Sequence, residues 1–405
     1  MFHRASVAFF IIGFTLACEN AGGDAGQFTY GPDPGELPPA GGGGGGSGVG
    51  GGGGGGGGNV DGGVGGGGWV DDAGSAVCGP GGITGRVCAP SARLFLAQAR
   101  VFVDATDCNG NAVHRETTSD NDGRFTLSGV PSGRWTLTIE KGSFRVSRTV
   151  QVIAGRTVNA AESEEKLCFA RNAVKIAVVT GDWDNVGHSL DTLGFQYDTI
   201  EGRQLGFSTD VVTFLRDRNR MMTYDIIMLN CGSRTAQDMP SDWPTAAANL
   251  KAFVEAGKSL YVSDWAHMAL ESLYPGAVEF YGQDDDWMDV DIGSVPQTVN
   301  ASIVSSALST QLGRSTVSVT FPSPRAALWA VMERTGTGSE VLIRGSVQRC
   351  QSSLYCGTPI TVNNAPLTVL YRTPGNGKIL YTSFHWESVA SNEVLELLRA
   401  VLFML

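Results

Sequence analysis

The sequence predicts a multidomain chain in which an all-β sandwich is followed by a three-layer α/β domain. Between residues 78 and 168, short runs of alternating apolar and polar residues recur between Gly-rich turns, which is typical of sandwich strands. Between residues 174 and 405, apolar strands alternate with helical patterns, as in βαβ units built on a parallel sheet.

The composition argues against one large class of partner. The 405 residues carry 29 Lys and Arg against 40 Asp and Glu, which gives a formal net charge of −11. A nucleic-acid partner would need a basic face, so none is expected. No CxxC pair or His/Cys cluster with zinc spacing occurs, and we expect no cofactor.

The N-terminus has the pattern of a targeting segment. His3 and Arg4 precede an apolar run over residues 5–16, which is shorter than the ~20 residues that span a bilayer. This pattern predicts a signal peptide over residues 1–17. Thr15-Leu16-Ala17-Cys18 resembles the cleavage box of bacterial lipoproteins. The resemblance implies that Cys18 carries a lipid; the alternative is an ordinary signal peptide with an incidental Cys.

Residues 18–77 are predicted to form a disordered tether. Gly accounts for 22 of the 28 residues from 41 to 68. Such a chain cannot bury enough surface to offset the entropy lost on ordering. A Gly-rich chain of this length spans an r.m.s. distance of roughly 40 Å. With a lipid at one end, we expect a protein held outside the cytoplasm, at the outer membrane or the cell surface.

The eight cysteines indicate an oxidising compartment. If Cys18 is lipidated, seven remain and at least one is unpaired; Cys231, at the end of a buried strand, is the expected free thiol. Spacing alone does not fix the pairing of the others. The candidates are Cys350 with Cys356, which would close a small loop, Cys88 with Cys108, which flank a hairpin region, and Cys78 with Cys168, which bracket the β segment.

Six strands are expected in the β segment, separated by turn signals such as Asn109-Gly110. They cover residues 83–87, 99–103, 112–117, 123–127, 133–140 and 144–153. Asp120, Asn121 and Asp122 suggest either a calcium site or an Asx-rich hairpin turn before Gly123, and we favour the turn.

An ordered set of motifs in this segment resembles the carboxypeptidase regulatory-like domain. The set reads ITGRV at residues 83–87, ARVFV at 99–103, TSDNDGRF at 118–125 and VPSG at 130–133. It covers nearly the whole of residues 78–168. The resemblance implies an immunoglobulin-like sandwich without catalytic residues of its own.

The α/β segment begins with a strand over residues 175–179. Further strands are expected over 197–200, 224–230 and 260–262, with helices over 186–193, 209–217 and 245–256. Five later strands, over 317–321, 327–332, 341–347, 367–371 and 378–384, have a mixed or antiparallel pattern. A last helix over 392–404 carries an apolar stripe at helical spacing, which we expect to dock on the sheet.

The stretch GKSLYVSDWAHM, residues 257–268, is where the chemistry of this domain is expected. A helical pattern stops at Gly257, an apolar strand follows, and Ser263 and Asp264 form a polar corner before another helix over 265–273. In many α/β folds a strand, a sharp corner and a helix lift one side chain to the C-terminal edge of the sheet.

The α/β segment resembles the class I glutamine amidotransferase-like superfamily, especially its non-amidotransferase relatives of the trehalose-utilisation type. The matching features are the strand 174–179 with Gly181 after it, YDII from Tyr224, the corner unit, and GKILYTSFHWE at 377–387. The resemblance implies a flavodoxin-like three-layer fold. Catalytic members carry a Cys at the corner and a late His-x-Glu. Here His385 and Glu387 match the late pair, whereas the corner has no Cys and no flanking Gly.

The missing nucleophile leads us to expect a non-catalytic module that binds a small molecule, a glycan or a protein. One alternative is a hydrolase of envelope or extracellular carbohydrate or peptide that uses Ser263 or Asp264 with His385 and Glu387. A second alternative is a surface spacer or adhesion protein. His267, just after the corner, is expected to pack rather than react.

Two further loops carry candidate side chains. Asp182, Trp183, Asp184 and His188 follow the first strand, where they either bind a ligand at the sheet edge or form an ordinary capping loop. The segment 282–293 holds clustered carboxylates, which suggest a weak calcium site or, as we favour, a solvated acidic loop. These carboxylates are Asp284, Asp285, Asp286, Asp289 and Asp291.

Overall fold

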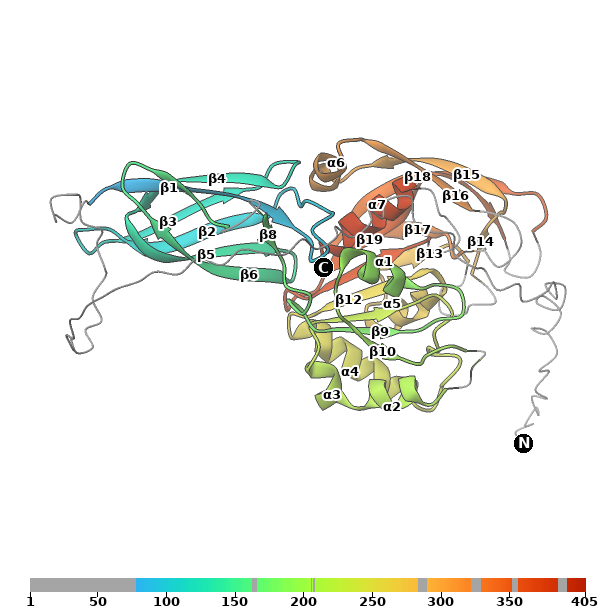
Figure 1. Cartoon of the computed structure of the whole chain (residues 1–405). Helices are drawn as coiled ribbons and strands as arrows, with labels where there is room; N and C mark the ends of the chain where they lie inside the picture. The colour runs from blue at the N-terminus through green and yellow to red at the C-terminus, as the bar shows by residue number, and fades with distance from the viewer. Residues whose placement is uncertain are drawn as a thin grey trace, which may run out of the picture. The chain divides into compact units, whose positions relative to one another are not determined.

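The computed structural model describes residues 78–161, 166–204, 206, 208–282, 290–321, 329–351, 356–384 and 392–405 (Figure 1). All of them belong to one compact unit, residues 66–405. The predicted signal peptide, the lipid on Cys18 and the tether therefore lie outside the described residues. Among the helices that are described, none is long and apolar enough to cross a membrane.

Residues 80–168 form a sandwich, as the sequence predicts, but its two four-stranded sheets hold eight strands where six were expected, because the short strands β7 and β8 were not predicted. One sheet has the order β3-β2-β5-β6 and is antiparallel; in the other, β1 pairs with β4, β7 and β8. The strands are β1 (Pro80–Cys88), β2 (Arg100–Thr106), β3 (Ala112–Thr118), β4 (Arg124–Pro131), β5 (Gly133–Lys141), β6 (Phe144–Val152), β7 (Thr157–Asn159) and β8 (Lys166–Cys168).

The period-two alternation of the sandwich strands explains their position. In β2, Val101 and Val103 are buried while Arg100 and Asp104 are exposed. Successive side chains of a strand point to opposite faces, so one face of each sheet joins the core and the other meets solvent. The Asx turn favoured for residues 120–123 is present, because Asp120 Oδ1 accepts hydrogen bonds from the backbone N of Asp122 and Arg124 at 2.9 and 2.8 Å.

The disulfides of the described residues join Cys78 to Cys108, Cys88 to Cys168, and Cys350 to Cys356. The alternatives Cys88 with Cys108 and Cys78 with Cys168 are therefore wrong. The reason is that β8 runs parallel to β1, which makes Cys88 and Cys168 register partners, a long-range pairing that local spacing does not reveal. Cys231 is a free, buried cysteine, as expected.

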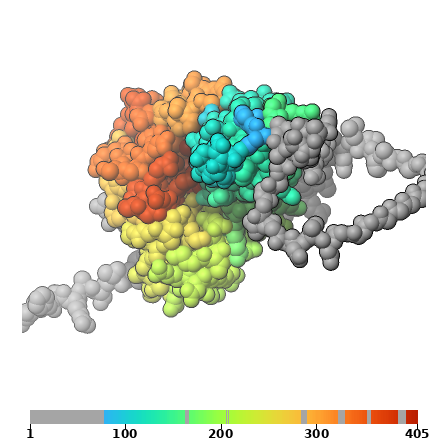
Figure 2. All heavy atoms as spheres, turned by 90° about the vertical axis from the view of Figure 1, so that its left-hand side faces the viewer, coloured from blue at the N-terminus to red at the C-terminus, as the bar shows by residue number. Residues whose placement is uncertain are grey.

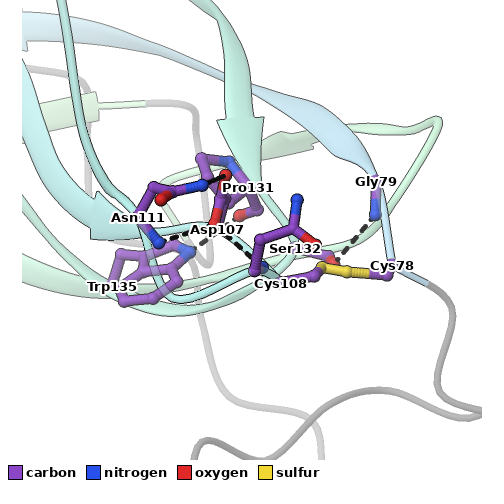
Figure 3. The surroundings of a disulfide bond; sticks show 9 residues. Cys78, Gly79, Asp107, Cys108, Asn111, Pro131, Ser132 and Trp135 are labelled. Atoms are coloured by element: carbon purple, nitrogen blue, oxygen red, sulfur yellow. Dashed lines mark hydrogen bonds between the residues drawn. A yellow bond between two sulfur atoms is a disulfide. The ribbon is translucent and has the colours of Figure 1, made fainter.

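The Cys78–Cys108 disulfide ties the first described residue to the turn between β2 and β3 (Figure 3). In that turn Asp107 Oδ1 accepts from the backbone N of Asn111 at 2.8 Å. Close by, Trp135 Nε1 donates to the carbonyl of Pro131 at 2.7 Å. The point where the predicted tether would join the sandwich is therefore covalently fixed to two strands.

The α/β domain is built on a ten-stranded sheet with the order β10-β9-β11-β12-β20-β19-β18-β15-β16, and β14 also pairs with β18. The strands from β10 to β20 in this order are parallel, and those from β20 to β16 are antiparallel. Their bounds are β9 (Ile176–Val179), β10 (Asp198–Ile200), β11 (Ile226–Leu229), β12 (Ser259–Ser263), β14 (Ile292–Gly293), β15 (Gln297–Ile303), β16 (Thr316–Phe321), β18 (Ser339–Cys350), β19 (Ile360–Arg372) and β20 (Lys378–Thr382).

Two short strands, β13 (Val278–Phe280) and β17 (Met332–Thr335), form a separate pair. The strand predicted over 327–332 is therefore displaced, because β17 begins where it was expected to end. The helices are α1 (Val186–Leu193), α2 (Asp210–Arg216), α3 (Arg218–Met222), α4 (Trp243–Glu255), α5 (His267–Leu273), α6 (Ser306–Leu312) and α7 (Asn392–Leu402).

Alternate residues of the parallel strands enter two different cores, which confirms the three-layer prediction. Ile176 and Met228 pack in the same cluster as side chains of α1 and α7. Val179 and Leu229 pack in the cluster that holds side chains of α2, α4 and α5. Figure 1 shows α2, α3 and α4 together on one face of the parallel strands. Burial on both faces explains why these strands are continuously apolar.

The sandwich packs against the edge of the sheet where β12 and β20 begin. The ring of Phe144 lies 4.8 Å from that of Phe195 and 4.9 Å from that of Phe403. The hydroxyl of Ser143 lies 3.2 Å from that of Ser259, the first residue of β12. Figure 2 shows blue-green sandwich atoms next to red atoms from the C-terminal part of the chain. The amino-terminal edge of the parallel strands is thus the side that meets the sandwich.

Candidate functional site: the corner at the C-terminal edge of the sheet

The sheet has a topological switch point beside β9. The chain passes from β9 to β10 on one side and then to β11 on the other. In open α/β sheets, ligands bind at the C-terminal ends of the strands beside such a point. The loops after β9, β11 and β12 meet at this edge, because the three strands are parallel neighbours.

Asp264, rather than Ser263, occupies the sharp turn of the corner. Its φ is +44°, a conformation that few residues other than Gly adopt and that Asp tolerates better than most. Ser263 is the last residue of β12 and is extended. The short helix η1 (Asp264–Ala266) and α5 follow directly. The backbone therefore forms the strand–turn–helix corner that the sequence predicts, with a carboxylate at its apex.

Ser263 is fully buried and its hydroxyl is hydrogen-bonded on both sides. Ser263 Oγ accepts from the backbone N of Cys231 at 2.9 Å and donates to Asp184 Oδ2 at 2.5 Å. The residues involved come from the ends of β12, β11 and β9, so the corner joins three neighbouring strands. Ser263 is 0 % exposed and Asp184 is 4 % exposed.

Asp264 is also buried, at 1 % exposure, and its carboxylate is used within the protein. Asp264 Oδ1 accepts from the backbone N of Ala330 at 3.3 Å, and Oδ2 accepts from Cys231 Sγ at 3.7 Å. The Tyr381 hydroxyl donates to the Asp264 carbonyl at 3.2 Å. Buried polar groups that satisfy one another in this way form a stable network.

Burial determines the protonation of the neighbouring groups. It raises the pKa of the Cys231 thiol well above its ordinary value, and the charge of Asp264 raises it further. The pKa of the Tyr381 phenol is raised by the same two causes in the same order. Because the thiolate is the reactive form of cysteine, Cys231 is held in its unreactive state.

His267 is fully buried at the start of α5. Its ring lies 4.9 Å from the ring of Phe280, and burial lowers the pKa of the imidazole to about 4. The imidazole is therefore neutral at physiological pH and packs in the core, in line with the expectation from the sequence.

The four candidate residues after β9, namely Asp182, Trp183, Asp184 and His188, do not all face the corner. Asp184 turns inward to Ser263, whereas His188 is exposed on α1. The backbone N of Asp182 and of Trp183 donates to carbonyls in the loop after β11, at 3.4 and 3.2 Å. At the N-terminus of α1, Asn230 Oδ1 accepts from the backbone N of Val186 at 3.4 Å.

Several predicted site residues lie outside the described residues. They include the late pair, His385 and Glu387, and the acidic residues Asp284, Asp285, Asp286 and Asp289. Asp291 is described; it is buried and forms an ion pair with Arg349. Within the described ranges, no group of three or more His, Cys, Asp or Glu side chains is placed to hold a metal ion.

Cys231 and the link from Asp184 to Ser263 were not anticipated as parts of the corner. Asp184, Cys231 and Ser263 each lie at or just after the end of a predicted strand, and this position is visible in the sequence. That the three residues meet depends on the order of the strands in the sheet, which places β9, β11 and β12 side by side.

The sandwich matches a known family of domains. Residues 82–162 match the carboxypeptidase regulatory-like domain. This match confirms the prediction made from the motifs between residues 83 and 133. No curated protein matches the chain.

Several solved structures are similar over the remainder of the chain. The mmIFT52 N-terminal domain has 9% identity and a TM-score of 0.35 and covers 57% of this chain and 95% of its own. Cytoplasmic protein STM3548 from Salmonella typhimurium has 12% identity and a TM-score of 0.35, with 57% and 96% covered. PurLQS from Thermotoga maritima has 12% identity and a TM-score of 0.32, with 56% and 97% covered. Since these TM-scores are below 0.5, the description of the α/β domain rests on its own strand order and direction.

Proposed function

We propose that the protein is a lipid-anchored, extracytoplasmic module that binds a ligand or partner and that performs no hydrolysis at its corner. One observation carries this proposal. The two side chains that the corner could offer as a nucleophile, Ser263 and Asp264, are 0 % and 1 % exposed and are hydrogen-bonded within the protein.

The hydrogen bonds among the described residues of the corner also support this proposal. A nucleophile elbow needs a reactive side chain open to the substrate and backbone N–H groups free to hold the oxyanion. Here the backbone N of Cys231 is bonded to Ser263 Oγ, and the thiol of Cys231 is bonded to the carboxylate of Asp264. The groups that would act on a substrate are engaged with one another.

The proposed location is the outer membrane or the cell surface. It is supported by the targeting pattern before Cys18, by the Gly-rich segment that follows, and by three disulfides, which are typical of oxidising compartments. Metabolic labelling with a lipid analogue tests it. We expect the label on the full chain and none on the Cys18→Ser variant, which should also leave the membrane fraction; a labelled variant would contradict the anchor.

One observation favours a second function, a hydrolase. The positive φ of Asp264 retains the backbone conformation of a nucleophile elbow, and such strain concentrates at functional sites. In a hydrolase of this kind, the Asp264 carboxylate would attack the anomeric carbon of a glycoside or the carbonyl carbon of a peptide. The bond to the leaving alcohol or amine would break as that group takes a proton from a neighbouring acid, and water would then attack the same carbon and free Asp264. His385 and Glu387 would be its candidate partners.

A single experiment separates the two functions. The full chain is incubated with envelope carbohydrate and peptide fractions in water enriched in oxygen-18, and the released sugars and peptides are analysed by mass spectrometry for the oxygen that water adds. We expect no labelled product above that of the Asp264→Asn variant. Labelled product from the native chain that is lost in Asp264→Asn would replace the binding module by the hydrolase.

A further inference from the structure

A cavity of about 340 Å³ lies at the opposite, amino-terminal edge of the sheet. The sandwich contributes residues of β2 and β5 and the turn after β5, and the α/β domain contributes α6, β19, β20 and the residues after α7. The charged side chains that line it are Arg100, Glu140, Lys141, Arg372 and Lys378. Four of the five are cations, in a chain whose formal net charge is −11.

Two of these cations are neutralised by acidic side chains. Arg100 forms ion pairs with Glu116 at 2.9 Å and with Glu140 at 3.3 Å. Arg372 lies 3.5 Å from Glu340. Because Arg100 and Arg372 are paired with glutamates, the remaining positive charge of the cavity belongs to the two lysines.

Among the described residues, Lys141 and Lys378 take part in no ion pair, and Lys378 Nζ donates to the carbonyl of Met404 at 2.9 Å. Lys378 is also the cross-strand partner of Arg372 in the β19–β20 hairpin. Like charges in such a pair repel each other. Among the side chains that line the cavity, the two lysines are therefore the cations without a paired carboxylate, while Leu405, the last residue, accepts from the backbone N of Ser143 in the turn beside them.

The surroundings of both lysines disfavour their charge. Burial lowers the pKa of Lys141 to about 8. Burial, followed by the charge of Arg372, lowers the pKa of Lys378 to about 8. Both ammonium groups are still charged at pH 7, and a half-buried charge without a counter-charge is costly. An anion between them would relieve that cost.

We propose that this cavity binds a small oxyanion, a phosphate or a phosphate monoester, between Lys141 and Lys378. Lysine ammonium groups act as point-charge donors to phosphate, and two of them match its double charge. The volume admits a phosphate with a small organic group. The phosphate could belong to a free ester or to a phospholipid headgroup, and the test distinguishes these sources. The proposal does not depend on the corner or on its lack of catalysis.

Calorimetric titration of the purified full chain with inorganic phosphate tests the site, with chloride at matched ionic strength as the blank. We expect saturable binding that is at least about tenfold weaker in the Lys141→Met/Lys378→Met double variant. Lys251→Met is the matched control, because Lys251 is also half-buried but lies on α4, outside the cavity lining, and pairs with Glu255 there. The Lys378→Arg variant keeps the positive charge and should bind phosphate like the native chain. This variant shows whether the double variant loses binding through its lost charge or through its changed side-chain shape.

The affinity for phosphate should also fall as the pH rises. Across pH 7 to 9 both lysines lose most of their protons, so phosphate should bind at least about tenfold more weakly at pH 9; the other charged side chains that line the cavity are Arg100, Arg372 and Glu140. Absence of saturable binding, or equal binding by the native chain and the double variant, would overturn the proposal.

Vesicle flotation identifies the source of the phosphate. The full-length Cys18→Ser variant, which would lack the proposed lipid, is mixed with vesicles of phosphatidylglycerol or of phosphatidylcholine alone. Flotation with phosphatidylglycerol that is lost in the double lysine variant supports a headgroup. Binding of glycerol phosphate in solution without flotation supports a free ester. If neither ligand binds in a lysine-dependent way, the site is not a phosphate site.

Discussion

The two edges of the central sheet treat their polar groups in opposite ways. At the carboxyl edge, Ser263, Asp264 and Asp184 are buried and bonded within one network with Cys231. At the amino edge, Lys141 and Lys378 face a cavity without an acidic partner of their own. At the edge where such folds place their chemistry, these described polar groups bond one another, whereas at the other edge the two lysines lack a paired carboxylate. A fold alone therefore does not locate the function of this chain.

The largest contrast is expected in the reactivity of Cys231. Because burial and the charge of Asp264 keep its thiol protonated, alkylation in the native chain at pH 8 should be at least about a thousandfold slower than in the unfolded chain. Peptide mass spectrometry after alkylation with iodoacetamide, with and without guanidinium chloride, measures both rates. Fast alkylation of Cys231 in the native chain would mean that the corner is open to ligands.

Substitution of Asp264 should cause the next largest effect. Asp264→Ala removes two buried hydrogen-bond acceptors and places at a positive φ a residue that tolerates it poorly, so we expect a loss of about 3 kcal/mol in the free energy of unfolding. Asp264→Asn keeps an acceptor and a residue that tolerates this φ, and should lose about half as much.

Urea unfolding of the full chain under oxidising conditions measures both variants. Ser302→Ala, an exposed serine on β15, is the matched control and should be neutral within about 0.5 kcal/mol. An Asp264→Ala variant as stable as the native chain would show that the network does not stabilise the corner, and the contrast between the two edges would then disappear.

Most of the fold followed from local patterns. Alternation in β2 and β4, Gly-rich turns and the motifs of residues 83–133 predicted the sandwich, and continuous apolar runs predicted β9, β11 and β12. The alternating strand β15 and the helix α6 were missed. These misses lie in the antiparallel half of the sheet, which did not repeat the strand–helix pattern of the parallel half.

The candidate site could be predicted only in part, because its residues are joined by sheet order. The corner itself is local, so Ser263 and Asp264 were found. Asp184 and Cys231 reach it only because β9 and β11 run beside β12, and single-sequence patterns do not give strand order. Lys141 and Lys378 come from different domains, and neither belongs to a local motif that would indicate a site.

The smallest effect on the free energy of unfolding is expected from substitution of Lys141 at the amino edge, and this substitution should stabilise the chain. The pKa of Lys141 is about 8 in the folded chain and ordinarily about 10.4 in an unfolded one. Between pH 8 and 10 the unfolded chain therefore binds more protons, so this lysine makes the free energy of unfolding rise with pH in that window. Below pH 8 both states are protonated, and its contribution is constant.

Lys141→Met should remove the rise in the free energy of unfolding between pH 8 and 10. In phosphate-free buffer at pH 7 it should also stabilise the chain by about 1 kcal/mol, because an apolar side chain of similar length replaces a half-buried charge without an acidic partner. Urea unfolding of the native and variant chains at pH 7, 8 and 9 measures both effects. Lys251→Met should show neither, because the ammonium group of Lys251 on α4 is already paired with Glu255. If Lys141→Met destabilises the chain as Asp264→Ala does, the charge of Lys141 is balanced within the protein. The two edges of the sheet would then be alike in satisfying their own polar groups, and an external anion would not be needed.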